Sequence, residues 1–184
     1  MRRSILSFLS IVVVSATPVA AQPSTVILVR HAEKVSQTDP DPILSDAGTQ
    51  RAKELAAALA DAHISTVITT QYQRTILTAA PLIAGSRPTS IVVANSGQAA
   101  AHIADVAATI LARPAGEIVL VVGHSNTVTA IISALGGPKI PNLCDSQYAS
   151  MFILEMNGSS PPRLIRSSYG AADQPDATCP KVSK

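Results

Sequence analysis

Residues 26–34 carry the sequence VILVRHAEK, in which four apolar residues run directly into a charged cluster. A second run of the same kind, IVLVV at residues 118–122, continues into GHSN. Apolar runs without alternation are typical of strands that are buried on both faces of a largely parallel sheet. Shorter runs at residues 67–68 and 91–93 predict two more strands of this sheet.

Segments with a helical period separate these strands. The apolar residues recur at i, i+3, i+4 and i+7, and the first segment follows Ser45-Asp46, a typical helix cap. The predicted helical segments cover residues 52–59, 76–84, 103–111 and 128–135, and two further strands are predicted at about 150–155 and 163–168. This alternation predicts an α/β protein of three layers, with a central, mostly parallel sheet and helices on both faces.

The composition restricts the class of protein. A chain of 184 residues that is 47% hydrophobic has the length and apolar content of one compact domain, which argues against a disordered protein. The chain has three Tyr, two Phe and no Trp, so few aromatic side chains are available to stack on nucleic-acid bases. A net charge of +2 also argues against binding along a phosphate backbone, so nucleic acid is not an expected partner.

The first 21 residues have the three regions of a secretory signal peptide. Arg2-Arg3 precede the apolar run Ile5 to Val14, and small residues follow as far as Ala21. We expect residues 1–21 to be removed and residues 22–184 to form the domain. The remaining chain has twelve basic and twelve acidic residues, because the 14 Lys and Arg lose Arg2 and Arg3 while the 12 Asp and Glu are unaffected. The protein is therefore predicted to be exported by a bacterial cell, to the periplasm or beyond, without stable insertion in the membrane.

Export makes a disulfide between the two cysteines the expected state. Cys144 and Cys179 both lie in the predicted mature chain, and in an oxidising compartment two cysteines most simply pair. The chain-entropy model gives on the order of 4 kcal/mol for closing a loop of about 35 residues. A zinc site is the poorer alternative, because neither cysteine has a Cys or His at ligand spacing.

Charged and polar residues follow the predicted strands at the point where each strand ends. Arg30 and His31 follow the first strand, Arg74 comes soon after the second, and His124 and Ser125 follow the run at 118–122. Ligands of such sheets bind at the carboxyl ends of the strands, so these side chains are expected to meet at one edge. The other two histidines, His63 and His102, fall on helices or their ends and are expected to be packing or surface residues.

This set of side chains suits a phosphoryl group. Two guanidinium groups match a tetrahedral oxyanion bidentately, so Arg30 and Arg74 predict a phosphate pocket. A neutral imidazole can attack phosphorus, and a second, protonated imidazole can stabilise the oxygens in the transition state.

Three motifs carry a resemblance to a known family. Residues 28–34 (LVRHAEK), 44–52 (LSDAGTQRA) and 121–126 (VVGHSN) closely resemble the histidine phosphatase superfamily, also called the phosphoglycerate mutase-like family. The resemblance implies that fold and assigns roles by position. His31 matches the nucleophile that becomes phosphohistidine, and His124 matches the second core histidine. Arg30 and Arg74 match the two phosphate-binding arginines.

The first motif indicates a branch within that family. Ala32 replaces the glycine that commonly follows the histidine, so the motif is RHAE. This variant resembles the small, compact branch that includes bacterial phosphohistidine phosphatases. Gly48 and Arg51, at the start of the first helix, are expected to be structural.

One expected residue is missing. Members of the family usually supply a carboxylic acid that protonates the leaving oxygen, but the region after Arg74 holds Asn95 and Gln98 instead. Glu33 is the best remaining candidate for this proton donor, and its alternative role is to pair with Lys34 or orient an arginine. Without a donor, aryl phosphates should react faster than sugar phosphates, because their leaving groups need less help.

The resulting prediction is a metal-independent phosphatase without a cofactor, acting on a small-molecule phosphate ester or a phosphorylated protein. The alternative is a non-catalytic protein of the same fold that binds a phosphorylated ligand. A metal site is unsupported because His31, Glu33 and His124 lack a ligand spacing. A mutase is disfavoured by the short chain, which has little room for insertions.

A serine hydrolase is also disfavoured. Ser125 stands in a strand-to-helix turn, but Thr127 replaces the second glycine of that motif and no histidine follows His124. Ser125 is expected to cap the fourth helix or to contact the ligand.

Overall fold

A computed structural model describes residues 22–156, 158, 161–177 and 179 of the chain. The predicted signal peptide at residues 1–21 lies outside the described residues, and so do residues 180–184. Within the described part, no helix combines the length and the apolar character that crossing a bilayer requires.

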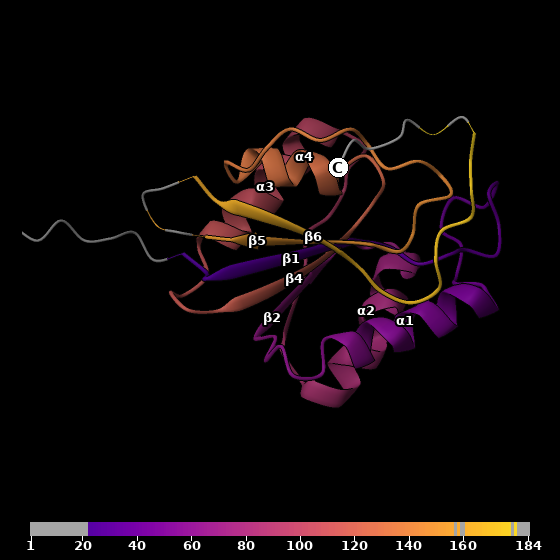
Figure 1. The fold of residues 1–184 in the computed structure, drawn as a ribbon, viewed down its shortest axis with the longest axis horizontal. Coiled ribbons are helices and arrows are strands. Elements are labelled where there is room, and N and C mark those ends of the chain that lie inside the picture. The colour runs from indigo at the N-terminus through magenta and orange to yellow at the C-terminus, as the bar shows by residue number, and fades with distance from the viewer. Residues whose placement is uncertain (1–21, 157, 159–160, 178, 180–184) are drawn as a thin grey trace, which may run out of the picture.

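The described residues form six strands and four helices that alternate along most of the chain (Figure 1). In chain order these are β1 (Thr25–Arg30), α1 (Asp46–Ala58), β2 (Thr66–Thr69), α2 (Gln73–Ser86), β3 (Thr89–Val92), α3 (Ala99–Leu111), β4 (Ile118–Gly123), α4 (Val128–Ala134), β5 (Ser150–Glu155) and β6 (Arg163–Ser168).

All six strands pair in one sheet with the order β3-β2-β4-β1-β5-β6. The pairs β3–β2, β2–β4 and β4–β1 are parallel, whereas β5 runs antiparallel to both β1 and β6. The predicted mostly parallel sheet is therefore confirmed, with β5 as the reversed strand. Because β1 lies next to β4 and β4 next to β2, the carboxyl ends of these three strands share one edge.

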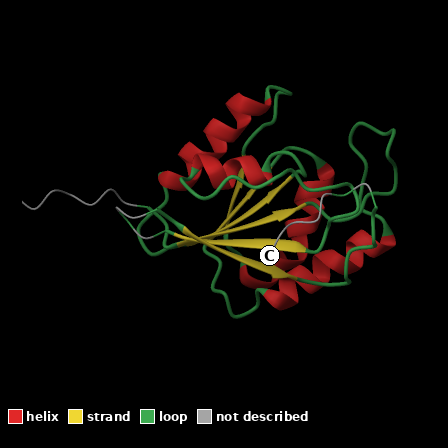
Figure 2. Cartoon of the chain, turned by 45° about the horizontal axis from the view of Figure 1, so that its top comes forward, coloured by secondary structure: helices red, strands yellow, loops and turns green. Residues whose placement is uncertain are grey.

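The helices cover the two faces of the sheet, as predicted. Helices α3 and α4 lie on one face and α1 and α2 on the other (Figures 1 and 2). The side chains of β1 alternate between two hydrophobic cores, one on each face of the sheet. Val26 and Leu28 pack with α3 and α4, whereas Ile27 and Val29 pack with α1 and α2. The sheet is thus buried on both sides, which explains the unbroken apolar runs.

The start of α1 is fixed against the loop that follows β1. Ser45 caps the helix, since its hydroxyl accepts a hydrogen bond from the Gly48 amide at 3.1 Å, and this confirms the predicted cap. The Ser45 amide donates to the Glu33 carbonyl at 2.9 Å. A Cβ on Gly48 would collide with the Glu33 backbone, so only glycine allows this close approach. Gly48 therefore has the expected structural role.

The helix α2 begins at Gln73, three residues earlier than the apolar pattern predicts. Its cap comes from outside the helix, because the Asp41 carboxylate accepts a hydrogen bond from the Gln73 amide at 2.8 Å. A capping residue so distant in sequence has no local signature. The same contact fastens the loop before α1 to the start of α2, next to Arg74.

Candidate active site

The pairing of β1 with β4 brings two of the predicted motifs together. Arg30 lies opposite Gly123 in the register of these parallel strands, and the His31 amide donates to the Gly123 carbonyl at 2.9 Å. His31 and His124 therefore leave the sheet side by side. Their ring centroids are 5.4 Å apart in an edge-on arrangement.

His31 is buried and has a defined tautomer. Its Nδ1 lies 2.8 Å from the Ala32 carbonyl oxygen, which can only accept, so Nδ1 carries the proton and Nε2 keeps its lone pair. Burial lowers the pKa of His31 to about 4, and the charges of Arg30 and Arg74 act in the same direction against the hydrogen bond to Ala32. A neutral imidazole with a free Nε2 can act as a nucleophile at neutral pH.

His124 is held by two threonines. Its Nε2 lies 3.2 Å from the Thr70 hydroxyl, which lies 2.9 Å from the Thr75 hydroxyl. Thr75 donates to the Tyr72 carbonyl at 2.9 Å, so its oxygen is left to accept from Thr70. Thr70 then accepts from His124, which places the imidazole proton on Nε2. Burial lowers the pKa of His124 to about 3, aided by the nearby His31.

The Arg30 side chain is almost fully buried, with 4% of its surface exposed. Its NH1 donates to the carbonyl oxygens of Cys144 at 2.7 Å, Asp145 at 3.1 Å and Gln147 at 3.1 Å. The guanidinium also lies 4.0 Å from the centroid of the Tyr148 ring. Its buried Nε has no hydrogen-bond partner. One edge of the guanidinium is thus fixed by the protein, and an anion can use the donors that remain.

Arg74 reaches the same place from the first turn of α2. Its guanidinium lies 4.3 Å from the centroid of the Tyr72 ring, and NH1 donates to the Pro40 carbonyl at 3.3 Å. The Asp41 carboxylate lies 3.8 Å away and completes the attachment to the loop. Tyr72 also meets His124 edge-on, with ring centroids 5.6 Å apart.

These side chains line one cavity of about 350 Å³. Of the residues predicted from sequence, Arg30, His31, Arg74, His124 and Ser125 all contribute to its wall. The remaining wall is polar and includes Lys34, Gln37, Asn95 and Asp145. The structure thus assembles two arginines, a lysine and two neutral histidines around one opening.

Glu33 is the predicted site residue that the structure does not bring to this cavity. Its carboxylate accepts from Arg51 in a bidentate pair, with Nε at 2.9 Å and NH2 at 2.8 Å from Oε1. Arg51 also donates to the carbonyls of Tyr169 and Ala171. Glu33 therefore fixes an arginine that joins α1 to the C-terminal segment, the alternative role that the sequence left open.

Several site residues were missed by the sequence analysis. Thr70 and Thr75 orient His124, and Tyr148 covers Arg30, but none of them belongs to the three motifs. The position of Thr70 directly after β2 is the one signal that could have indicated it. Ser125 does not cap α4, because the N-cap is Thr127.

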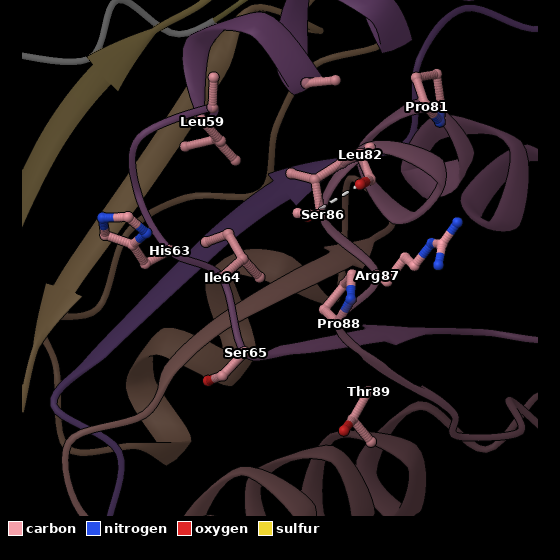
Figure 3. A pocket seen from close by; sticks show the side chains of 13 residues that line it. Leu59, His63, Ile64, Ser65, Pro81, Leu82, Ser86, Arg87, Pro88 and Thr89 are labelled. Atoms are coloured by element: carbon pink, nitrogen blue, oxygen red, sulfur yellow. Dashed lines mark hydrogen bonds between the residues drawn. The ribbon is translucent and has the colours of Figure 1, made fainter.

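A larger cavity of about 700 Å³ lies at the opposite end of the sheet, where Ser65 and Thr89 stand at the starts of β2 and β3. Figure 3 shows its two ionisable residues, His63 and Arg87, on opposite sides and pointing away from each other. Both have left-handed backbone conformations, with φ near 50°. Such a wall offers no converging charges, so the smaller cavity is the better candidate for catalysis.

The environments of the remaining groups agree with the sequence analysis. His102 is buried on α3, where Nδ1 lies 3.3 Å from the Ala94 carbonyl, and His63 is exposed. Both are therefore the packing and surface residues that were expected. The predicted disulfide between Cys144 and Cys179 is present, with Cα atoms 5.9 Å apart. The described residues contain no group of three or more His, Cys, Asp or Glu side chains arranged to hold a metal ion.

A protein-family model matches the N-terminal part of the domain. Residues 26–96 match the model of the histidine phosphatase superfamily (branch 1); they contain the first two of the three motifs, and the match confirms the resemblance seen there. Among curated proteins, none matches this chain significantly.

Solved structures share the fold at low sequence identity. The putative phosphohistidine phosphatase SixA from Agrobacterium tumefaciens is 19% identical with a TM-score of 0.54, and the match covers 83% of this chain and 100% of that one. The protein histidine phosphatase SixA complexed with tungstate is 17% identical with a TM-score of 0.62, and the match covers 78% of this chain and 96% of that one. A mycobacterial glucosyl-3-phosphoglycerate phosphatase in complex with inorganic phosphate is 17% identical with a TM-score of 0.60, and the match covers 81% of this chain and 98% of that one.

The lowered pKa values predict an acid-sensitive fold. His31 has a pKa of about 4 in the folded state, against about 6.5 in the unfolded chain, so between these values the unfolded state binds more protons. Stability must then fall as the pH falls through this window, by about 2 kcal/mol between pH 7 and pH 5 from His31 alone. Urea denaturation of the wild type and of His31→Asn at both pH values measures this. An equal loss of stability in the two proteins would contradict the assignment.

Proposed function

The chain carries a histidine phosphatase superfamily segment at residues 26–96, and on this premise we propose that it is a phosphatase that works through a phosphohistidine at His31. One observation carries the proposal. Two buried, neutral histidines stand edge-on at 5.4 Å and share a cavity with Arg30 and Arg74. Binding a phosphate needs only the arginines, whereas a paired nucleophile and second imidazole serve group transfer.

The first half of the reaction is the attack of His31. Arg30 and Arg74 bind the oxygens of the phosphoryl group and hold it in front of Nε2, which has the free lone pair. The N–P bond forms as the bond from phosphorus to the leaving oxygen breaks. In the second half, water attacks phosphorus, the N–P bond breaks and His31 is restored, with phosphate as the product. The same binding groups serve both halves.

His124 supports the transferring group. Because its proton lies on Nε2, toward Thr70, the other ring nitrogen can take up a proton when a phosphate dianion enters the cavity. An anion close to an imidazole favours its charged form, so binding opposes the lowering of the pKa that burial causes. The resulting imidazolium stabilises the charge that builds up on the phosphoryl oxygens.

The structural relatives support a tetrahedral oxyanion as the ligand. One of them is a SixA phosphatase with tungstate bound, and another is a phosphatase with inorganic phosphate bound. The cavity of this chain offers guanidinium groups that suit the same shape. We infer a phosphate monoester as the substrate, on a small molecule or on a protein, and a reaction that needs no metal ion.

The disulfide supports the proposal that the protein works outside the cytoplasm. A bridge between Cys144 and Cys179 persists in an oxidising compartment, such as the periplasm or the medium. This fits the signal peptide inferred for residues 1–21.

The proposed activity is tested with an aryl phosphate and the domain from residue 22 onward, in the presence of EDTA. We expect hydrolysis that EDTA does not reduce and that falls by at least about 10³-fold in His31→Ala, because the nucleophile is lost. Binding of inorganic phosphate should survive in that variant, since both arginines remain. A folded protein that binds phosphate but shows no hydrolysis would favour the non-catalytic alternative.

The position of Glu33 predicts the choice of substrate. Asp145 is the one carboxylate in the wall of the cavity within the described part of the chain, and it is solvent-exposed and paired with Arg30. We therefore expect kcat/KM to be higher for an aryl phosphate than for a sugar phosphate, and Glu33→Gln to leave this ratio unchanged while lowering stability by about 1–3 kcal/mol.

The matched control for this variant is Glu117→Gln. Glu117 also forms a bidentate pair with an arginine, Arg113, but at the opposite end of β4. If Glu33→Gln slows the sugar phosphate selectively and Glu117→Gln does not, Glu33 is a proton donor and the inference from its position is wrong.

A further inference from the structure

The turn at residues 144–147 holds one edge of Arg30. Three backbone carbonyls of this turn accept hydrogen bonds from the same nitrogen, NH1, at 2.7, 3.1 and 3.1 Å. A shift of the turn would move all three acceptors together. The direction in which the guanidinium faces the cavity is therefore set by a loop 114 residues away in sequence.

This turn is itself held by a small number of contacts. The Gln147 amide donates to the Cys144 carbonyl at 3.0 Å, and the Gln147 side-chain oxygen accepts from the Cys144 amide at 2.8 Å. The turn is attached to the C-terminal segment twice, by the disulfide from Cys144 to Cys179 and by the Ser146 hydroxyl, which donates to the Asp176 carboxylate at 3.2 Å. Asp173 fastens the next two residues, by accepting from the amides of Tyr148 and Ala149. The disulfide is thus the covalent attachment of the turn, and it lies at Cys144, whose carbonyl makes the shortest contact with Arg30.

The hydrogen-bond partners of the two histidines lie outside this turn, and Tyr148, which meets the His31 ring edge-on, is held separately by Asp173. His31 is fixed by the carbonyls of Ala32 and Gly123, and His124 by Thr70 and Thr127. A change in the turn should therefore act on phosphate binding through Arg30 and leave the reacting imidazoles in place.

We propose that the disulfide between Cys144 and Cys179 is a positioning element for Arg30, and that its reduction weakens the binding of phosphate at the candidate site. The proposal rests on the proposed function in one respect, that Arg30 binds the phosphoryl group. A dithiol supplies two electrons and two protons, the S–S bond breaks to give two thiols, and the dithiol is oxidised to its own disulfide. Both cysteines are only partly buried, so a small dithiol can reach them.

The test compares inorganic phosphate binding by calorimetry in the oxidised wild type, the wild type reduced with dithiothreitol, and Cys179→Ala. This variant removes the bridge and keeps Cys144 in the turn. We expect the Kd for phosphate to rise by about tenfold in both bridge-free proteins, because charge-assisted contacts of Arg30 lose their fixed geometry. With an aryl phosphate, KM should rise while kcat changes less. Reoxidation of the reduced wild type should restore the original Kd.

Two further variants separate positioning from stability. Ile110→Ala opens a cavity in the fully buried core between α3 and the sheet, so it lowers stability without touching the turn. It should bind phosphate like the wild type at temperatures where both are folded. Gln147→Met keeps the bridge but removes the side-chain acceptor of the Cys144 amide, and it should weaken phosphate binding in the oxidised state.

The outcomes are distinct. If the oxidised wild type does not bind phosphate, the proposed function fails. If the oxidised wild type binds phosphate and Cys179→Ala binds it equally well, the positioning role of the disulfide is wrong while the proposed function stands. If Ile110→Ala loses as much affinity as Cys179→Ala, the effect is one of general stability, which also overturns the positioning role.

Discussion

The candidate site exists because β1 and β4 are neighbours and run parallel. Their register puts Arg30 opposite Gly123, and the hydrogen bond from the His31 amide to the Gly123 carbonyl continues the pairing one residue beyond β1. Two imidazoles separated by 93 positions in sequence are thereby placed 5.4 Å apart. A one-residue slip would turn each side chain to the opposite face of the sheet. Because the flanking residues are fully buried, that slip is prevented by the whole apolar core.

Burial also sets the electrostatics of the site. The positive charges of Arg30 and Arg74 act on both histidines, and neither histidine has a carboxylate hydrogen-bonded to its ring. In such surroundings the neutral form is favoured, so the resting protein has a nucleophile in His31 and a positive field from its arginines. The field comes from groups that are fixed before any ligand arrives: Arg30 is held by backbone carbonyls and Tyr148, and Arg74 by the loop that caps α2. Fixed donors cost little reorganisation when charge develops in the transition state.

The sequence was sufficient for the parts of the fold that depend on local patterns. The buried strands show as apolar runs, α1 has its own cap in Ser45, and two strand ends place Arg30, His31 and His124 on one edge. The sequence was insufficient where a contact joins distant segments. Asp41 caps α2 from another loop, and no periodicity predicts this.

The role of Glu33 shows the same limit. Its place two residues after His31 made it a reasonable proton donor, but the side chain turns to Arg51 on α1. That choice depends on how α1 packs against the loop, at Gly48, and on the C-terminal segment near Tyr169. A carboxylate can pair with any of several groups that are equally close in sequence, and the packing of the chain decides which pair forms. Thr70 was missed for the related reason that a threonine at a strand end is unremarkable until a histidine faces it.

The most direct measurement is the capture of the phosphorylated protein. The domain is mixed with an aryl phosphate carrying radioactive phosphorus, quenched in base during turnover, and digested for peptide mapping. The account predicts a label on the peptide that contains His31, stable in base and lost in acid as a phosphoramidate is, and absent in His31→Ala. A label that survives acid, as a phosphoserine at Ser125 would, or a label that maps to His124, contradicts it.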